Sequence, residues 1–174
     1  MEAKGGPVAR PLCILERLAG MTYFMTMRLR AYQPKDFEKL YALDHLCFPR
    51  GIAYSKWMLR HFLKMPSANC IVAVEGDEIP GFVITEEAVP MGHVLTLDVA
   101  ESHRRRGLGT QLLQRGEAEL RERGVTEMVL ETAVQNSAGV AFWQRHGYRT
   151  VGTLKKYYLR RLDAFEMRKA LVEP

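Results

Sequence analysis

The run Arg104–Gly109, three arginines followed by Gly-Leu-Gly, is the group of residues that points most directly to chemistry. An apolar segment ends just before it, and helical periodicity begins directly after it. Gly107 and Gly109 admit backbone conformations and close approaches that a Cβ would prevent. The first N–H groups of the following helix have no internal partner and carry the positive end of its dipole. The pattern therefore predicts a loop that binds a phosphate group.

Two titratable residues on predicted strands are candidates for a general base. Glu131 lies near the end of the predicted strand Val125–Thr132, on the face opposite the apolar residues. His93 begins the predicted strand His93–Val99, and histidine titrates near neutral pH. A glutamate at a strand end and a histidine at a strand start also fit solvated surface positions, so both interpretations stay open at this point.

Nucleophilic and metal-based chemistry have little support in the sequence. Cys13, Cys47 and Cys70 are widely spaced, with no C-x-x-C pair and no histidine at a motif spacing. No cluster of His, Asp and Glu has the spacing of metal ligands. We therefore expect reduced thiols, no disulfide framework and no metal site.

The elements that must position these residues alternate between strands and helices. The predicted strands are Met27–Ala31, Asn69–Val74, Gly81–Glu86, His93–Val99, Val125–Thr132, Tyr148–Leu154 and Ala164–Leu171. The predicted helices are one that Pro34 and Asp36 open, one that Ser55 caps, Leu108–Arg123 and Asn136–His146. The order β-α-α-β-β-β-α-β-α-β-β has no repeat and no linker, which predicts one α/β domain with a mixed sheet.

The pattern also predicts which face of the second helix is buried and how the last two strands are connected. On the helix that follows Ser55, the side expected to be buried carries Trp57, Met58, Leu59, Phe62 and Leu63. The last two strands are expected to form a hairpin with a long connecting loop.

The ends and the composition of the chain add further expectations. The 174 residues suit one globular domain, and residues 1–26 fit no clear element, so we expect an N-terminal extension before a domain spanning 27–174. No apolar run approaches the ~20 residues that span a bilayer, which predicts a soluble cytoplasmic protein. The net charge of +5 fits an acidic ligand and an ordinary basic surface equally well. Nucleic-acid binding is not expected, because the arginine cluster is short, and the oligomeric state is not indicated.

Two motifs carry a resemblance to a known family. Arg104-Arg105-Arg106-Gly107-Leu108-Gly109 resembles the R/Q-x-x-G-x-G/A pyrophosphate loop of the GNAT acetyltransferase superfamily. The stretch Leu130–Tyr148, which includes Asn136 and Gly147, is similar to the family's L-E-V-x-x-x-N-x-x-A-x-x-x-Y-x-x-x-G-F pattern. The resemblance covers Met27 to Leu171. It implies a mixed sheet of about seven strands with a V-shaped gap between the fourth and fifth, flanked by about four helices.

The resemblance implies acetyl-CoA as the cofactor. Its pantetheine arm would pair with the backbone of the fourth strand, its pyrophosphate would lie on the N–H groups of the arginine-glycine loop, and Asn136 would contact the arm. Trp143 stands where the family usually has a tyrosine proposed to act on the leaving thiolate. An indole N–H donates a hydrogen bond but is no acid, so either no proton is transferred or a nearby tyrosine or water substitutes. The candidate cofactor residues are Leu97, Asp98, Val99, Arg104, Arg105, Arg106, Gly107, Leu108, Gly109, Thr110, Asn136 and Trp143.

Within the superfamily, the sequence most resembles protein N-terminal acetyltransferases, both the ribosomal-protein alanine type and the type that acts on Met-starting chains. Phe48-Pro49, with Tyr54 following, resembles their substrate-lining loop, and Tyr157-Tyr158 resembles the paired tyrosines that grip a peptide backbone. The resemblance implies catalytic roles for Glu131, His93 and Tyr157, and substrate contacts for Phe48, Pro49, Tyr54, Tyr157 and Tyr158. Arg50-Gly51-Ile52-Ala53 departs from both types.

The predicted reaction is direct acetyl transfer to a primary amine, and the favoured acceptor is the α-amine of a protein or peptide N-terminus. A peptide α-amine has a pKa about 2.5 units below that of lysine, so its deprotonation requires roughly 3.4 kcal/mol less. The alternatives are a small-molecule amine, a lysine side chain, and a non-catalytic acetyl-CoA-binding module, which the tryptophan at position 143 keeps open. A narrow peptide slot forms only if the Phe48-Pro49 loop and the Tyr157-Tyr158 loop meet over the fourth and fifth strands.

Overall fold

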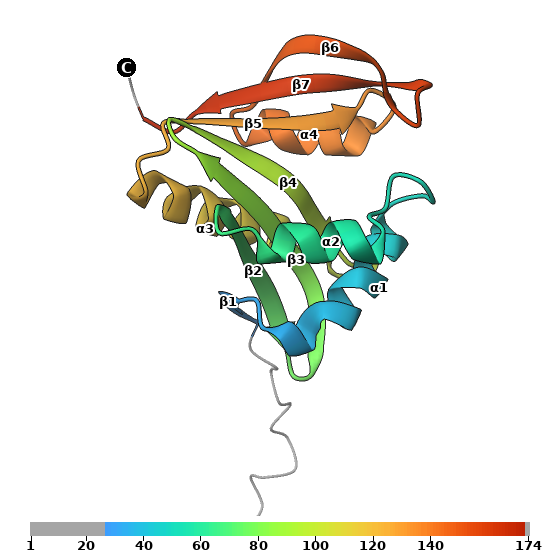
Figure 1. Cartoon of the computed structure of the whole chain (residues 1–174), viewed down its shortest axis with the longest axis vertical. Helices are drawn as coiled ribbons and strands as arrows, with labels where there is room; N and C mark the ends of the chain where they lie inside the picture. Colours follow the sequence, from blue (N-terminus) through green and yellow to red (C-terminus); the bar gives the residue numbers. More distant parts are fainter. Residues whose placement is uncertain (1–26, 173–174) are drawn as a thin grey trace, which may run out of the picture.

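A computed structural model describes residues 27–172, in which one seven-stranded sheet carries helices on both faces (Figure 1). The strands are β1 Arg28–Ala31, β2 Ala68–Glu75, β3 Glu78–Ala88, β4 Met91–Val99, β5 Glu127–Ala133, β6 Arg149–Tyr158 and β7 Leu162–Ala170. The helices are α1 Phe37–Cys47, α2 Lys56–Lys64, α3 Leu108–Glu122 and α4 Ser137–Arg145, with short 3-10 turns η2 Pro34–Asp36 and η3 Glu101–His103. The predicted α/β class, element order and helix number are confirmed.

The strands lie in the order β1-β2-β3-β4-β5-β7-β6, and all neighbours are antiparallel except β4 and β5. Helix α3 covers one face, where Leu112, Leu113 and Leu120 pack on the apolar side chains of β2–β5 and β7. Helices α1 and α2 cover the other face, where Leu40 and Leu59 belong to a second apolar cluster. Each helix is thus held by its apolar stripe.

The sheet forks between β4 and β5, as the resemblance implied. These parallel strands pair only over Met91–His93 and Glu127–Val129, and they separate beyond that point (Figure 1). Against β3, the strand β4 also carries one extra residue, Leu95, because Thr85 pairs with Val94 while Ile84 pairs with Thr96. A bulge of this kind bends its strand, so the fork has a local cause in β4.

Some details differ from the sequence-based expectations. Trp57 and Met58 are 73% and 39% exposed, so α2 packs on a narrower face that includes the buried Leu59. An amphipathic helix buries one stripe of its surface, and here Leu59, Phe62 and Leu63 form that stripe. The connection between β6 and β7 is a short turn, because both strands extend further than the sequence pattern indicated.

Two expectations concern the ends of the chain and membranes. The expected extension over residues 1–26 lies outside the described residues. Within residues 27–172, no helix is long and apolar enough to cross a bilayer.

Candidate active site

A pair of titratable side chains lies where β4 and β5 separate. His93 is the last β4 residue that pairs with β5, opposite Val129, and Glu131 follows two residues further along β5. The Nε2 atom of His93 is 2.8 Å from Oε2 of Glu131. Their side chains are 32% and 17% exposed, so both are partly shielded from solvent. The two candidate bases named from the sequence therefore form one hydrogen-bonded pair.

The protonation states of this pair follow from its surroundings. Burial acts to raise the pKa of Glu131, but the hydrogen bond and charge of His93, with a hydrogen bond from Tyr157, outweigh it and lower that pKa. Glu131 is therefore a carboxylate at neutral pH. Burial raises the pKa of Tyr157 to about 12, and the charge of Glu131 adds to the shift. Tyr157 consequently keeps its proton.

Two neighbouring tyrosines at the end of β6 flank this pair. The hydroxyl of Tyr158 donates to the backbone carbonyl of Glu131, with an O···O distance of 3.1 Å. The rings of Tyr157 and Tyr158 meet edge to face, with centroids 4.9 Å apart. The tyrosine pair is thus fixed to β5 at the residue that carries the carboxylate.

A β-bulge just before the tyrosines sets the direction of their side chains. The register between β6 and β7 shifts between Leu154 and Tyr158, and Lys156 has a positive φ of 54°. Asp163 on β7 stabilises this conformation. Its Oδ1 accepts the N–H of Lys156 at 2.9 Å, and its Oδ2 accepts Nζ of Lys155 at 2.8 Å. Because a bulge re-aims the side chains around it, Asp163 acts as a positioning residue.

The loop between α1 and α2 approaches the site from the other side. The Tyr54 hydroxyl donates to the carbonyl of Leu95, the extra residue of β4, at 2.8 Å. The N–H of Tyr54 donates to Oδ2 of Asp44 at 2.7 Å. Asp44 is buried, and burial raises its pKa to about 6. One tyrosine thus ties this loop both to helix α1 and to the bulge in β4.

The α1–α2 loop and the β6–β7 turn contact each other. Gly51 has a φ of +92°, and a Cβ placed on it would lie only 2.6 Å from Cδ2 of Leu159 in the turn. Phe48 is half-buried at the end of α1, and Pro49 next to it is exposed. The two loops that the resemblance assigned to a substrate therefore contact each other through Gly51 and Leu159.

The loop ahead of α3 offers backbone N–H groups to an anion. Arg105 and Gly107 have positive φ values of 58° and 83°. Gly107 is the N-cap of α3, and within the described residues no side chain caps the first turn. The N–H groups of Leu108, Gly109 and Thr110 therefore remain available at the positive end of the helix dipole. This arrangement suits a phosphate group.

Helix α4 supports the start of α3 through His146, a residue that the sequence analysis did not single out. Nδ1 of His146 lies 2.8 Å from the carbonyl of Phe142, and Nε2 lies 2.9 Å from the hydroxyl of Thr110. A carbonyl only accepts, so Nδ1 carries the proton and, in the neutral ring, Nε2 accepts from Thr110. The hydroxyl of Thr110 is therefore occupied within the protein, which leaves its backbone N–H for a ligand.

The three arginines of the loop are not equivalent. Arg104 folds back onto the protein, where its Nε donates to the Val99 carbonyl at 2.9 Å and its Nη2 lies 3.7 Å from Sγ of Cys47. Arg105 and Arg106 are exposed. Arg104 therefore positions the loop, and the side chains of Arg105 and Arg106 remain free to contact an anion.

Neither described cysteine has the properties of a nucleophile. Burial raises the pKa of Cys47 and nearby Asp98 adds to the shift, while the guanidinium of Arg104 offsets only part of it. Burial also raises the pKa of Cys70. Both thiols are free and protonated at neutral pH, and the thiolate is the nucleophilic form.

The predicted cofactor residues on β4 lie beyond the fork. Over Leu97–Val99, the edge of β4 that faces β5 has no strand partner among the described residues. The side chain of Asp98 is buried, its Oδ1 accepts the hydroxyl of Thr96, and burial raises its pKa well above the usual range. Asp98 can therefore offer only backbone groups to a ligand.

The predicted cofactor residues on α4 have structural roles of their own. Asn136 caps the helix, since its Oδ1 accepts the N–H of Gly139 at 3.0 Å. This leaves its Nδ2 group to donate to a ligand. Trp143 packs edge to face on Phe142 and Tyr148, with centroids 4.9 and 5.5 Å away. The indole is therefore a rigid apolar wall with a single N–H donor.

Several residues of the site were missed by the sequence analysis. Asp44 had a detectable pattern, because it follows Leu40 by one helical turn on the face that is buried. Burying a carboxylate on an apolar helix face costs folding free energy unless the carboxylate has a hydrogen-bond or ion-pair partner. Asp163 and the bulge at Leu95 had no such pattern, since a bulge arises from register with a distant strand.

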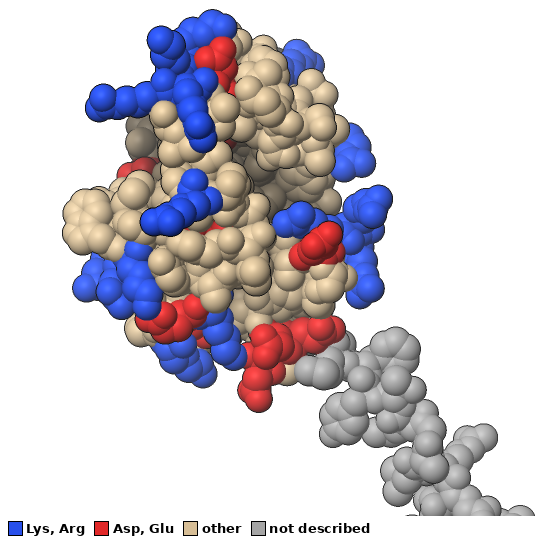
Figure 2. Space-filling model, turned by 90° about the vertical axis from the view of Figure 1, so that its right-hand side faces the viewer, with Lys and Arg blue, Asp and Glu red and all other residues tan. Residues whose placement is uncertain are grey.

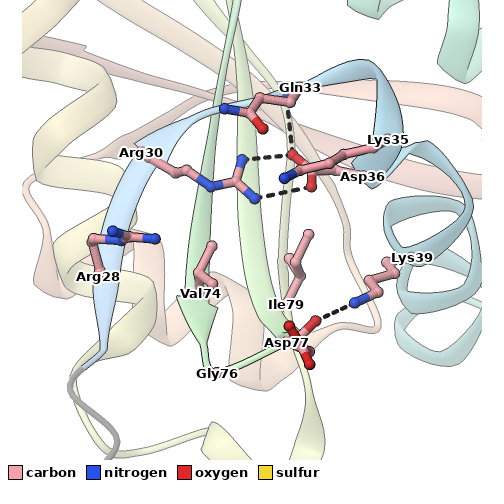
Figure 3. Close-up of a pocket in the computed structure, with 10 residues that line it drawn as sticks. All are labelled: Arg28, Arg30, Gln33, Lys35, Asp36, Lys39, Val74, Gly76, Asp77 and Ile79. Atoms are coloured by element: carbon pink, nitrogen blue, oxygen red, sulfur yellow. Dashed lines mark hydrogen bonds and ion pairs between the residues drawn. The ribbon is translucent and has the colours of Figure 1, made fainter.

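A separate hollow of about 560 Å³ lies at the opposite end of the sheet, beside β1, η2 and the β2–β3 turn (Figure 3). Arg30 forms a two-point ion pair with Asp36 there, at 2.6 and 2.9 Å, and Lys39 donates to the carbonyl of Asp77. None of the site residues predicted from the sequence lines this hollow. Arg30 and Lys39 are engaged by local groups, and the hollow lies apart from the Glu131–His93 pair.

Comparison with known sequences gives one family and several relatives. The model of the Acetyltransferase (GNAT) family matches residues 37–148. N-alpha-acetyltransferase 30 of Schizosaccharomyces pombe is 33% identical over 117 residues, which cover 64% of this chain and 78% of the relative. An N-alpha-acetyltransferase of Sulfurisphaera tokodaii is 27% identical over 153 residues, which cover 80% of this chain and 90% of the relative.

Solved structures show the same fold. The ribosomal-protein-S18-alanine N-acetyltransferase from Escherichia coli superposes with a TM-score of 0.78 at 20% identity, covering 86% of this chain and 96% of that one. Ard1 from Thermoplasma volcanium also gives a TM-score of 0.78, at 21% identity, covering 84% of this chain and 99% of that one.

Proposed function

The chain belongs to the GNAT acetyltransferase family, and from this premise we propose that it transfers an acetyl group from acetyl-CoA to the α-amine of a protein or peptide N-terminus. The observation that carries the proposal is the Glu131–His93 pair at the fork of β4 and β5, with two contacting loops beside it. The sequence relatives, which are N-alpha-acetyltransferases, support the choice of acceptor.

Acetyl-CoA fits the backbone groups that the protein leaves available. The N–H groups of Arg105–Thr110 would hold the pyrophosphate, and the side chains of Arg105 and Arg106 would add charge. The free edge of Leu97–Val99 would pair with the amides of the pantetheine arm. Asn136 and Trp143 would contact the arm from α4. When bound, acetyl-CoA supplies an activated acyl group as a thioester.

Glu131 and His93 would take the proton from the acceptor amine. Glu131 is ionised at neutral pH and accepts a hydrogen bond from Nε2–H of His93, so the pair presents a carboxylate that can accept a proton. A protonated α-amine has a pKa of about 7.7–8.0, so it needs only a weak base, directly or through one water. The pair suits this task because its partial burial keeps the carboxylate fixed while leaving a path for the proton.

The three tyrosines of the site would hold the acceptor chain in place. Tyr54 and Tyr158 donate to backbone carbonyls of Leu95 and Glu131, which fixes their rings at the two sides of the fork. The hydroxyl of Tyr157 stays protonated beside the carboxylate. Since all three pKa values are raised by burial, we assign these residues to orienting and donating hydrogen bonds.

Direct transfer without an acyl-enzyme is supported by the state of the two described thiols. Cys47 and Cys70 are protonated, and neither approaches the Glu131–His93 pair in any recorded hydrogen bond. We further propose that residues 27–174 form the acetyltransferase domain and that the protein acts in the cytoplasm, which is consistent with its free cysteines.

The test is a thiol-release assay with acetyl-CoA and two matched peptides. One peptide has a free N-terminus and no lysine, and the other has a blocked N-terminus and one internal lysine. We expect transfer to the free N-terminus only. Transfer only to lysine would move the acceptor to side chains. Tight acetyl-CoA binding without transfer to either peptide or to a panel of small amines would favour a binding module.

A further inference from the structure

Basic side chains surround the place where the two substrate loops meet. Arg50 belongs to the α1–α2 loop, and Lys155, Lys156, Arg160 and Arg161 belong to the end of β6 and the β6–β7 turn. All five, which we call the basic rim, are exposed. Figure 2 shows Lys and Arg side chains gathered on the lobe formed by the C-terminal hairpin, above a hollow in the surface.

The basic rim is largely uncompensated. Among residues 27–172, Lys155 is the one rim residue with an ion-pair partner, Asp163 at 2.8 Å. The other four cations have none in this part of the chain, so the rim carries a surplus of positive charge. Two of these cations, Arg160 and Arg161, stand in or next to a turn whose Leu159 and Arg160 have positive φ values of 55°. The turn therefore holds them in a defined place rather than on a loose tail.

The rim lies next to the proposed acceptor site. Gly51 follows Arg50 and lies against Leu159, which precedes Arg160. Tyr157 and Tyr158, beside the carboxylate, come just before the same turn. An extended peptide advances about 3.3–3.6 Å per residue. A chain whose amine reaches Glu131 would therefore have its third residue about ten ångströms further out, and it would leave the site past these two loops.

We propose that the preferred acceptors are protein N-termini that carry Asp or Glu from about the third to the seventh residue, where their carboxylates meet the basic rim. This inference rests on the proposed function, and it adds a specificity that neither the family nor the fold assigns. The first residues enter the slot between the loops, and the acidic stretch remains outside it. The attraction acts through exposed charges, so it raises the rate of encounter and lowers KM more than it raises kcat.

Nucleic acid is the other polyanion that a basic surface could attract. The rim cations come from the α1–α2 loop, the end of β6 and the β6–β7 turn, so they cluster where these segments meet instead of following one groove. A peptide must pass this place in order to react, whereas a nucleic acid has no reason to lie there. The geometry therefore favours the acidic peptide.

The experiment compares peptides that share their first two residues and differ at positions 3–7, where they carry Glu, Gln or Lys. The ratio of kcat/KM for the Glu peptide to that for the Gln peptide is measured at low salt and at 0.5 M salt. We expect a ratio of about threefold to tenfold at low salt, because each exposed ion pair contributes little. High salt should bring the ratio close to one, since it screens exposed charges.

The matched variants separate local from global charge. Arg50→Glu with Arg161→Glu removes four units of charge at the rim, and Arg28→Glu with Lys35→Glu removes the same charge at the opposite end of the sheet. We expect the first double variant to abolish or invert the preference for the Glu peptide, and the second to retain it. Arg50→Gln with Arg161→Gln serves as a milder variant if the reversal impairs folding.

The outcomes distinguish this inference from the function beneath it. No acetylation of any free N-terminus would overturn the proposed function itself. Acetylation of all three peptides with equal kcat/KM, or a preference that survives the rim variants, would overturn only the specificity. Equal peptide rates together with inhibition by a short single-stranded RNA, relieved by the rim variants, would assign the surface to nucleic acid and reject the proposal.

Discussion

Glu131 and His93 illustrate how a residue's role depends on its contacts more than on its type. A glutamate on a strand face is usually solvated, but here burial, the imidazole and the Tyr157 hydroxyl act on one carboxylate together. The net effect lowers the pKa of Glu131, so this side chain is ionised at every pH at which the acceptor amine is neutral enough to react. At the residue scale, the base is therefore a pair rather than a single side chain.

We expect Glu131→Gln to lower kcat by about 10²–10⁴-fold, because the amide can hold His93 but cannot accept the proton. Binding of CoA, measured by calorimetry, should change little, since the substituted side chain lies on the acceptor side of the fork. The control is Glu127→Gln on the same face of β5, where the carboxylate pairs with Arg168. A Glu131→Gln enzyme with full kcat, or an equally inactive Glu127→Gln enzyme, would remove Glu131 from the mechanism.

The rate should also depend on pH in one direction. Because the pKa of Glu131 is lowered, this group is already ionised above the ordinary carboxyl range. The acceptor α-amine, with a pKa near 7.7–8.0, then limits the reaction on the acid side. We expect kcat/KM for a peptide to rise from pH 6 to pH 8 and then level off. An optimum below pH 6 would contradict this assignment.

At the scale of the element, two glycines flank helix α3, and they share a backbone conformation but differ in their expected role. Gly107 before the helix and Gly124 after it both have positive φ, at +83° and +91°. Neither has a crowded Cβ position, since a Cβ at Gly107 meets nothing within 4 Å and one at Gly124 lies 3.9 Å from Val89. Their backbone strain is therefore comparable, but only Gly107 belongs to the loop that we propose binds phosphate.

Gly107→Ala and Gly124→Ala should each reduce the free energy of unfolding by about 1–2 kcal/mol, the usual penalty for a side chain at positive φ. Only Gly107→Ala should also weaken CoA binding, because its relaxation turns the N–H groups of the loop away from the pyrophosphate. Denaturant titration and calorimetry with CoA measure the two quantities. Equal losses of CoA affinity in both variants would show that the loop geometry is not what binds the cofactor.

Asp44 gives a stability prediction for the α1–α2 loop. Its pKa is raised to about 6 by burial, so the folded state disfavours the charged form. The folded protein thus binds a proton more tightly than the unfolded chain, and the penalty is absent at low pH and complete above pH 6. We expect Asp44→Asn to increase the free energy of unfolding by about 1–3 kcal/mol at pH 8 and far less near pH 4. A loss of stability at pH 8 would mean that the carboxylate is itself a stabilising group.

Local patterns in the sequence were sufficient for the elements and for the glycine turn ahead of α3. Alternation and capping residues predict β4, β5 and α3, because those depend on neighbours a few positions away. The extent of β6 could not be predicted, since its last residues pair only after Lys156 adopts a positive φ that Asp163 stabilises. The contact between Gly51 and Leu159 is of the same kind, because it joins loops from opposite ends of the chain.

At the scale of the whole molecule, the two parts of the sheet share little backbone pairing across the fork. On the α3 side, a buried polar cluster adds contacts between the two parts of the sheet. Glu117 accepts the hydroxyl of Tyr148 at 3.0 Å and Nζ of Lys169 at 2.6 Å. It thereby joins α3 to the segment after α4 and to β7. Because Glu117 is almost fully buried, it depends on both partners.

Lys169→Met should lower the free energy of unfolding by about 2–3 kcal/mol, because it leaves a buried carboxylate with one partner. Lys56→Met is the matched control, since Lys56 and Glu38 are 2.8 Å apart but well exposed, and its effect should stay within about 0.5 kcal/mol. Urea titration of both variants gives the comparison. Similar losses in the two would show that burial does not set the strength of this ion pair.

The free edge of β4 inside the fork also bears on edge-to-edge pairing between copies of the sheet. Exposed strand edges can recruit other chains, and proteins blunt them with short strands, charges and bulges. Here β1 is four residues long and carries Arg28 and Arg30, while β6 carries two register shifts and adjacent lysines. The inner edge over Leu97–Val99 has no strand partner among the described residues, but β5 lies on the other side of the fork. The arrangement that would bind a ligand therefore also hinders a second copy of the sheet from pairing with this edge.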